Sequence, residues 1–216
     1  MKKTLIFDFD GTISDTIYSI RDAINITMRN YGYPEKSYDE VKRAIGNGAR
    51  KLVSRLMPED AARNEDLVSE VFEYYQSMYF HTCMNAECYD GMLETLKELK
   101  RRGYIIAVLS NKSDVHVKRI TEGVIPQGIL SLAIGQREGY PTKPDPTVPL
   151  MMVKELGGEA ANAAFIGDSD VDIITAKNSG MMSVGCDWGY RDREVLAACG
   201  ADVLVSRPTE LLDVFK

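Results

Sequence analysis

Acidic, basic and hydroxyl residues that could do chemistry together fall into four groups along this 216-residue sequence. Each group lies where a predicted strand ends: Asp8 and Asp10, then Ser110 and Asn111, then Lys143, then Asp168 and Asp172. In an open α/β sheet, ligands bind at the carboxyl ends of the strands. We therefore expect the four groups to meet in one site.

The chemistry that these residue types support is hydrolysis through a covalent carboxylate intermediate. A carboxylate such as Asp8 can attack phosphorus and divide a difficult hydrolysis into two steps. Because carboxylate and phosphate are both anionic, a divalent cation must neutralise part of the charge. Asp8 and Asp168 offer the hard oxygen ligands that Mg²⁺ prefers. The sequence thus predicts a Mg²⁺-dependent phosphatase with Asp8 as nucleophile.

The remaining polar residues have complementary chemistry. Lys143 supplies local positive charge in a chain whose net charge is -6, and its ammonium can hold the nucleophile and the phosphoryl oxygens together. The Ser110 hydroxyl and nearby amides can hydrogen-bond the transferring oxygens. Asp10, two residues from the nucleophile, is placed to protonate the leaving group and then to activate water.

Strands and helices alternate in the part of the chain that carries most of these residues. Short apolar runs without alternation predict strands that are buried on both faces of a parallel sheet. They cover 4–7, 104–109, 163–166, 182–184 and 203–205. Helical patterns cover 92–102 and 171–178, and Pro208 suits the first turn of a last helix. This order predicts a doubly wound, Rossmann-like α/β core.

The stretch from about residue 16 to residue 89 has a different pattern. It shows no convincing strand, and apolar residues recur at helical spacing from Ile17 to Met28 and from Val68 to Tyr75. Gly46-Asn47-Gly48 predicts a turn between helices. We therefore predict a helical cap domain at 16–89, inserted after the first strand into a core domain formed by 1–15 and 90–216.

Charge and composition narrow the possible partners. A net charge of -6 gives no support for nucleic-acid or membrane-surface binding, which needs a basic face. No segment approaches the roughly 20 apolar residues of a membrane helix. We expect a cytoplasmic protein that acts on a small phosphorylated molecule, binding neither nucleic acid nor membrane, as a monomer or a homodimer.

The ordered motifs resemble those of haloacid dehalogenase superfamily phosphatases, and within them the phosphoglycolate phosphatase-like group. The matching motifs are Asp8-Phe9-Asp10-Gly11-Thr12, Leu109-Ser110-Asn111-Lys112, Lys143-Pro144-Asp145-Pro146 and Gly167-Asp168-Ser169-Asp170-Val171-Asp172. The resemblance spans nearly the whole chain. It implies a Rossmann-like core with a helical cap inserted after the first motif, and a Mg²⁺ cofactor.

The resemblance also implies roles for individual residues. Asp8 would be nucleophile and metal ligand, and Asp10 would be acid/base and a metal ligand through its backbone carbonyl. Asp168 would bind the metal, with Asp172 supporting the site. We expect four core residues to bind the substrate: Thr12, Ser110, Asn111 and Lys143.

Asp10 distinguishes among the reactions of this superfamily. Halide departs without a proton, whereas an alkoxide leaving group benefits from one, so an acid at this position favours a phosphatase over a dehalogenase. A β-phosphoglucomutase-like sugar-phosphate mutase remains an alternative, because it shares this aspartate. A non-catalytic binding protein would be expected to have lost the nucleophile, the lysine or a metal aspartate, and none is lost here.

Substrate choice is expected to lie in the cap, which would close over the site and exclude water. Gly48 allows close approach to a ligand, and Arg50 could pair with a substrate carboxylate or a second phosphate. A solvated Arg50 at the start of a helix is an equal alternative. Phosphoglycolate is the leading substrate, followed by pyrophosphate and nucleotide or sugar phosphates. We assign no role to His81 or His116 from the sequence.

Overall fold

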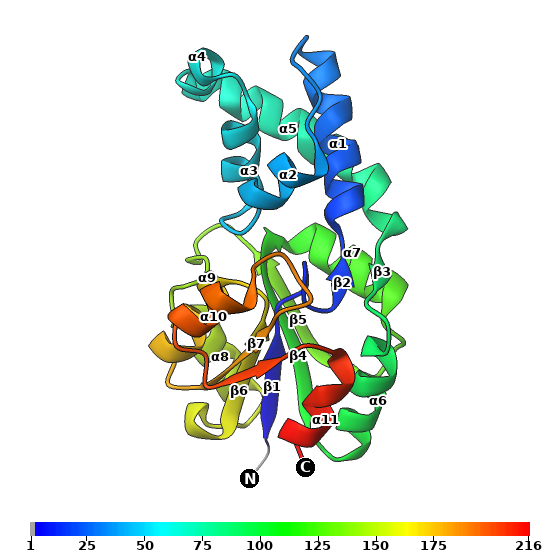
Figure 1. The fold of residues 1–216 in the computed structure, drawn as a ribbon, viewed down its shortest axis with the longest axis vertical. Coiled ribbons are helices and arrows are strands. Elements are labelled where there is room, and N and C mark those ends of the chain that lie inside the picture. The colour runs from blue at the N-terminus through cyan, green and yellow to red at the C-terminus, as the bar shows by residue number, and fades with distance from the viewer. Residues whose placement is uncertain (1–2) are drawn as a thin grey trace.

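The computed structural model describes residues 3–216, and its centre is a six-stranded parallel sheet (Figure 1). The strand order is β5-β4-β1-β6-β7-β8. The bounds are β1 Thr4–Phe7, β4 Ile105–Ser113, β5 Leu130–Gln136, β6 Ala163–Gly167, β7 Met182–Cys186 and β8 Val203–Val205. The chain starts at the centre, fills one side through β4 and β5, and then crosses to β6 on the other side. The switch point of strand order therefore lies beside β1.

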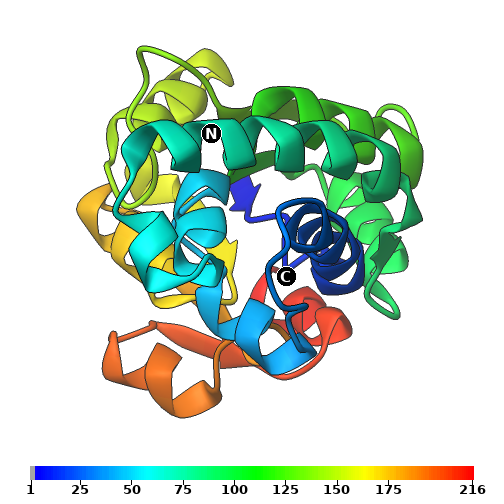
Figure 2. The same cartoon turned by 90° about the horizontal axis from the view of Figure 1, so that it is seen from above.

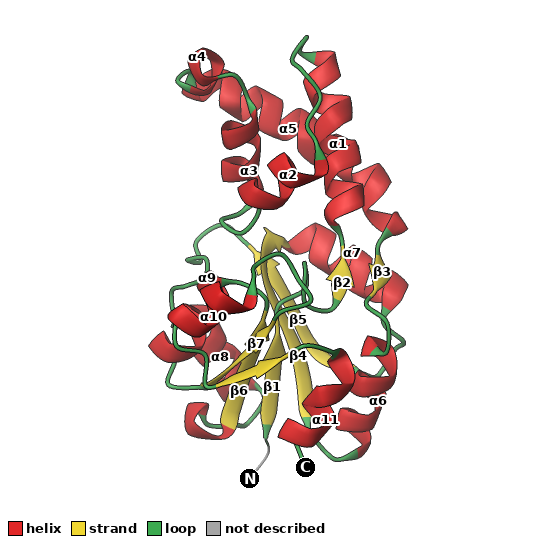
Figure 3. Cartoon of the chain, viewed as in Figure 1, coloured by secondary structure: helices red, strands yellow, loops and turns green. Residues whose placement is uncertain are grey.

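Helices cover both faces of this sheet (Figure 3). Because side chains alternate along a strand, Leu5 and Phe7 join one buried cluster while Ile6 joins the other. The first cluster includes residues of α6 (Met92–Arg101), α7 (Asp114–Val124) and α11 (Leu211–Val214), and the second includes residues of α8 (Thr147–Glu155) and α9 (Asp170–Asn178). Helix α10 (Arg193–Ala198) packs near β7 and β8. The predicted Rossmann-like α/β core is confirmed.

A group of helices follows the first strand and lies over the carboxyl ends of the sheet (Figures 1 and 2). The group contains α1 (Ile17–Asn30), α2 (Tyr38–Ala44), α3 (Ala49–Leu56), α4 (Glu59–Ala62), α5 (Glu65–Thr82) and a short 3-10 turn at Cys83–Asn85. The chain enters it through β2 (Ser14–Asp15) and leaves through β3 (Glu87–Cys88), which pair antiparallel. The helical insertion is confirmed, whereas its boundaries at 16 and 89 stay a prediction. Residues 1 and 2, assigned to the core, lie outside the described residues.

The short strands β2 and β3 were not predicted, and two strands of the six-stranded sheet also differ from the sequence prediction. The sequence prediction placed Lys143 after a strand but gave that strand no bounds. It is β5, an edge strand with one neighbour, and several of its side chains are only partly buried. β4 continues beyond residue 109, so Ser110 and Asn111 lie inside the strand. The pairing of β4 with β5 shifts between Leu109 and Ser113. At this shift β4 leaves regular pairing with β5, and its residues Ser110 to Lys112 line the candidate site instead.

Within residues 3–216, every helix is too short or too polar to span a membrane.

Candidate active site

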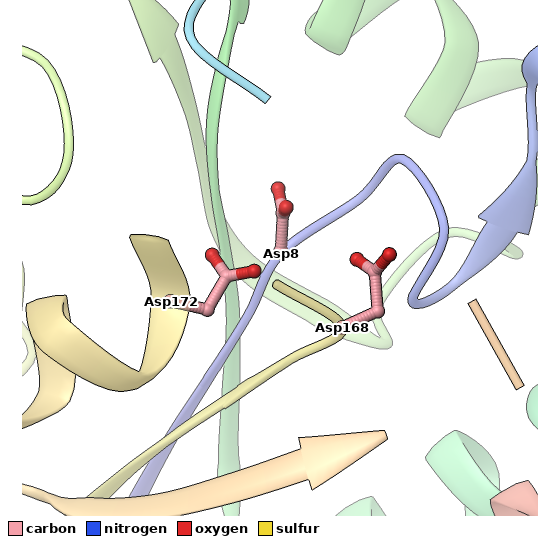
Figure 4. A group of neighbouring side chains, drawn as sticks. All are labelled: Asp8, Asp168 and Asp172. Carbon is pink, nitrogen blue, oxygen red and sulfur yellow. The ribbon is translucent and has the colours of Figure 1, made fainter. Parts of the chain in front are cut away.

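Three aspartates converge at the switch point of the sheet (Figure 4). Asp8 directly follows β1, Asp168 directly follows β6, and Asp172 lies in the first turn of α9. One carboxylate oxygen from each lies within 4.8 Å of the others. Asp168 and Asp172 are almost completely buried and Asp8 is 8% exposed. The topology therefore brings Asp8 together with two acids that follow it in the sequence by more than 150 residues.

Lys143 lies inside this acidic group. Its Nζ is 3.0 Å from Asp8 Oδ1 and 2.6 Å from Asp172 Oδ1. The Asn111 side chain fixes the lysine backbone: Oδ1 accepts from the Lys143 N–H at 2.8 Å, and Nδ2 donates to the Lys143 carbonyl at 3.1 Å. Burial lowers the pKa of Lys143, but the charges of Asp172 and Asp8 outweigh it and raise the pKa above the ordinary value. The lysine is a fixed positive charge.

One lysine does not balance three carboxylates. Burial raises the pKa of Asp8 well above its usual range, Lys143 opposes this, and the charges of Asp172 and Asp168 add to it. Burial and the charge of Asp172 raise the pKa of Asp168 to about 7. A dense group of hard oxygen donors with excess negative charge is the chemistry of a divalent-cation site. The donor set therefore fits such a cation.

Asp168 is oriented by hydrogen bonds from the Thr12 hydroxyl and from the backbone N–H of Tyr190. The Thr12 hydroxyl donates to Asp168 Oδ1 at 3.0 Å, and the Tyr190 N–H donates to Oδ2 at 2.7 Å. A Cβ at Gly11 or Gly189 would collide with this carboxylate, and Gly11 also has a φ of 84°. The expected contact of Thr12 with substrate is corrected: Thr12 is fully buried behind Asp168.

Asp10 faces the same pocket but does not join the three aspartates. Lys112 Nζ lies 2.8 Å from Asp10 Oδ1, and the Thr16 hydroxyl donates to the same oxygen. The same Nζ also donates to the Tyr79 hydroxyl on α5 at 2.7 Å. Sequence reasoning missed Lys112 as a site residue. Its position directly after Ser110-Asn111 in a matching motif was the available signal.

A single pocket between the sheet edge and the helical group collects most of the predicted residues. Seven of the expected site residues line it: Asp8, Asp10, Gly48, Ser110, Asn111, Lys143 and Asp168. Asp172 contacts Lys143 but is not among the lining residues. The opposite wall is largely apolar and comes from the helical group, with Ile20, Ile45, Leu52 and Tyr75. The pocket thus has a charged floor and an apolar roof.

The structure does not bring Arg50 to this pocket. Its Nη2 donates to Glu65 Oε2 at 2.8 Å and to Ser69 Oγ at 3.0 Å, on the exposed side of α5. Arg50 is the second residue of α3, in agreement with the alternative of a solvated arginine at the start of a helix, and Gly48 and Ala49 line the pocket instead. The expected pairing of Arg50 with substrate is therefore corrected, because its guanidinium is held by a surface carboxylate.

Replacement of Arg50 should have little effect on catalysis. The pair with Glu65 is solvent-exposed, and such pairs contribute about 0–1 kcal/mol. We expect Arg50→Ala to leave KM and kcat for the preferred substrate within about twofold of wild type, since RT ln 2 is about 0.4 kcal/mol. Steady-state kinetics beside Arg63→Ala, another exposed arginine paired on its own helix segment, measures this. A severalfold rise in KM for Arg50→Ala alone would return Arg50 to the substrate site.

Arg191 connects the helical group to the core. Its Nη2 donates to the Ile45 carbonyl at 2.8 Å, and its Nη1 donates to the Lys42 carbonyl at 3.4 Å. Asn111 Nδ2 also reaches the Gly46 carbonyl at 3.5 Å. These contacts hold the 45–48 loop over the pocket. They join residues up to 149 positions apart, so sequence periodicity could not indicate them.

The two histidines have different environments. His81 is exposed on α5, stacked edge-on against Phe80. His116 is buried beside Tyr79 and lines the pocket, and its Nδ1 has no hydrogen-bond partner among the described residues. Burial and the charge of Lys112 lower the pKa of His116 to about 4. His116 is therefore neutral at pH 7.

Comparisons with known proteins agree with this geometry. The family profile described as "Haloacid dehalogenase-like hydrolase" matches residues 5–186. Phosphoglycolate phosphatases are similar to this chain: that of Psychrobacter arcticus is 31% identical, covering 99% of this chain and 93% of the relative, and that of Aquifex aeolicus is 32% identical, covering 97% and 95%. A crystal structure of a predicted phosphoglycolate phosphatase from Haemophilus somnus superposes with a TM-score of 0.92 at 27% identity, covering 100% of this chain and 98% of that one.

Proposed function

Because this chain belongs to the haloacid dehalogenase-like hydrolases and is a phosphatase of the phosphoglycolate phosphatase-like group, we propose that it hydrolyses a small phosphorylated metabolite through an aspartyl-phosphate on Asp8. Phosphoglycolate is the leading substrate. The helices between residues 16 and 89 serve as the cap over the reaction.

In the first step, an Asp8 carboxylate oxygen attacks phosphorus and forms a P–O bond while the P–O bond to the leaving group breaks. Lys143, 3.0 Å from Asp8 Oδ1, offsets the repulsion between the nucleophile and the phosphoryl oxygens. The Ser110 hydroxyl lines the pocket beside them and donates to a phosphoryl oxygen. Asp10 gives its proton to the departing alkoxide oxygen.

In the second step, water attacks the phosphorus of the aspartyl-phosphate. Asp10, now ionised, accepts a proton from that water, and the P–O bond to Asp8 breaks to release inorganic phosphate. Asp8 leaves as a carboxylate and Asp10 is again protonated, so the residues return to their starting state. The cap contacts of Arg191 and Lys112 keep bulk water from the site during both steps.

Mg²⁺ is the cofactor that suits the acidic group. Asp8 and Asp168 would hold it, and the backbone carbonyl of Asp10 is a further proposed ligand. Asp172 would support the site by holding Lys143 at 2.6 Å. When bound, the ion supplies positive charge that neutralises the phosphoryl oxygens and the surrounding carboxylates.

The observation that carries this proposal is the different environment of two neighbouring aspartates. Asp8 belongs to the buried acidic group with Lys143, whereas Asp10 is held by Lys112 and Thr16 on the cap side of the pocket. A nucleophile near a cation and a separate proton donor are the two carboxylates that this reaction needs. A dehalogenase has no use for the second, because halide leaves without a proton.

Removal and return of Mg²⁺ tests the cofactor. We expect chelated protein to release no phosphate from p-nitrophenyl phosphate above background, and Mg²⁺ to restore release. Mg²⁺ should also raise the melting temperature, by the equivalent of about 2.7 kcal/mol at 100 times the dissociation constant. The control is the Asp168→Asn variant, which should lose most of the shift. Full activity in chelator would contradict the metal assignment.

A panel of small phosphorylated metabolites, ranked by kcat/KM, tests the substrate. Phosphoglycolate should rank first, ahead of pyrophosphate and of nucleotide and sugar phosphates. A sugar-phosphate mutase would instead interconvert its substrates and depend on a bisphosphate. A clear preference for another metabolite would overturn phosphoglycolate while leaving the phosphatase reaction in place.

A further inference from the structure

Lys112 is a nearly buried cation between the core and the cap. It lies in β4, two residues after Ser110, and its side chain is 8% exposed. Its Nζ donates to the Tyr79 hydroxyl at 2.7 Å, lies 2.8 Å from Asp10 Oδ1, and is 4.3 Å from the centre of the Tyr79 ring. These contacts fix the ammonium beside the proton donor, on the side where the leaving group must lie.

The other cations of this pocket are occupied elsewhere. Lys143 pairs with Asp8 and Asp172. Arg191 donates to backbone carbonyls of the cap loop. Within the described part of the chain, Lys112 is therefore the pocket-lining cation that faces the leaving-group side.

An ammonium group has three N–H donors. Two of those on Lys112 have partners in Tyr79 and Asp10, and the third is available to a ligand in the pocket. The neighbouring roof residues Ile20, Leu52 and Tyr75 offer mainly apolar surface. Since burying a carboxylate without a partner is strongly unfavourable, an anionic leaving group needs Lys112.

Distance from Asp10 limits how far the anionic group lies from the reacting ester. Asp10 must come within about 2.6–3.2 Å of the leaving oxygen to protonate it. The Lys112 ammonium is 2.8 Å from Oδ1 of the same carboxylate, so it lies at most about 8 Å from the leaving oxygen, even when the other carboxylate oxygen transfers the proton. A carboxylate bound by Lys112 is therefore separated from the ester oxygen by one or two carbons.

We propose that Lys112 is the residue that determines specificity, by binding a carboxylate on the leaving group one or two carbons from the ester oxygen. This inference rests on the proposed phosphatase function and assigns to Lys112 the recognition that the sequence suggested for Arg50. Tyr79 positions the ammonium from the cap, so the recognition exists only when cap and core are together.

The test compares 2-phosphoglycolate with its amide, 2-phosphoglycolamide, which has the same shape without the negative charge. The wild-type enzyme should favour the acid in kcat/KM. Lys112→Met should reduce this preference roughly 10- to 100-fold, the range expected for a hydrogen bond to a charged group. Lys112→Arg should restore part of it, and Lys51→Met, an exposed cap lysine, should leave it unchanged.

The ratio of the two substrates isolates recognition from other effects of the substitution. Loss of the Lys112 contact with Asp10 slows both substrates equally and cancels in the ratio. An unchanged ratio in Lys112→Met would overturn the inference, and so would a wild-type enzyme without preference for the acid, which needs no variant to fold. Absence of Mg²⁺-dependent p-nitrophenyl phosphate hydrolysis by wild type would instead overturn the proposed function.

Discussion

The Asp8→Asn variant should release phosphate at least about 10⁴-fold more slowly than wild type, because loss of a covalent nucleophile costs this much or more in other hydrolases. Asparagine keeps the shape of the side chain but cannot form the acyl phosphate. It also removes one negative charge from a buried group, in which burial and then the charges of Asp172 and Asp168 raise the pKa of Asp8. We therefore expect a melting temperature no lower than that of wild type, so the loss of activity would not reflect unfolding.

Covalent trapping shows directly whether Asp8 carries the phosphoryl group. Wild-type enzyme quenched with acid during turnover of ³²P-labelled substrate should retain label that hydroxylamine releases, as an acyl phosphate does. Asp8→Asn should retain none. The matched control is Asp145→Asn, an exposed carboxylate in the loop after Lys143, which should label normally. Label and near-normal turnover in Asp8→Asn would place the nucleophile on another residue.

Buried strands were predictable from the sequence because their environment leaves a simple signal. β1 and β6 are covered on both faces, so every residue in them is apolar or small, apart from Thr4. β5 lies at the edge, where several side chains stay partly accessible, and its sequence mixes Ser131 and Gly135 with apolar residues. An edge strand of this kind has no continuous apolar run to detect.

The acidic floor of the pocket was predictable for a topological reason. Parallel strands end at one edge of the sheet, so polar residues that follow different strands must approach each other. Asp8 and Asp168 follow adjacent strands, β1 and β6. Their proximity therefore follows from strand order alone, without knowledge of any side-chain contact.

Contacts between cap and core could not be predicted in this way. Lys112 hydrogen-bonds Tyr79, and Arg191 hydrogen-bonds the Ile45 carbonyl. Both hydrogen bonds depend on how α5 and the 45–48 loop pack over the sheet. Arg50 illustrates the opposite error. Helix α3 places the Arg50 side chain beside Glu65 on α5 instead of over the pocket. No local sequence pattern distinguishes these two orientations. Cap residues must therefore be assigned from the packed structure.

The Asp10→Asn variant should lose activity in proportion to how much the leaving group needs a proton. For phosphoglycolate, whose alkoxide is a poor leaving group, we expect kcat/KM to fall by about 10²–10⁴, the range for general acid–base catalysis. For p-nitrophenyl phosphate, whose phenolate departs without a proton, the first step should slow by less than about tenfold. A plot of log(kcat/KM) against leaving-group pKa should consequently be steeper for the variant.

Hydrolysis of the aspartyl-phosphate, the second step of the reaction, tests whether Asp10 transfers protons or only shapes the pocket. With p-nitrophenyl phosphate, Asp10→Asn should release about one nitrophenol per enzyme in a burst, followed by slow turnover, because water attack on the aspartyl-phosphate now lacks its base. Asp10 lies outside the group of three aspartates, so Mg²⁺ should still raise the melting temperature. Thr16→Ala, which removes a hydroxyl bound to Asp10, should keep the wild-type slope and give no burst. An equal loss of kcat/KM for all leaving groups, without a burst, would show that Asp10 positions substrate instead of transferring protons. Another residue would then have to distinguish phosphatase from dehalogenase chemistry.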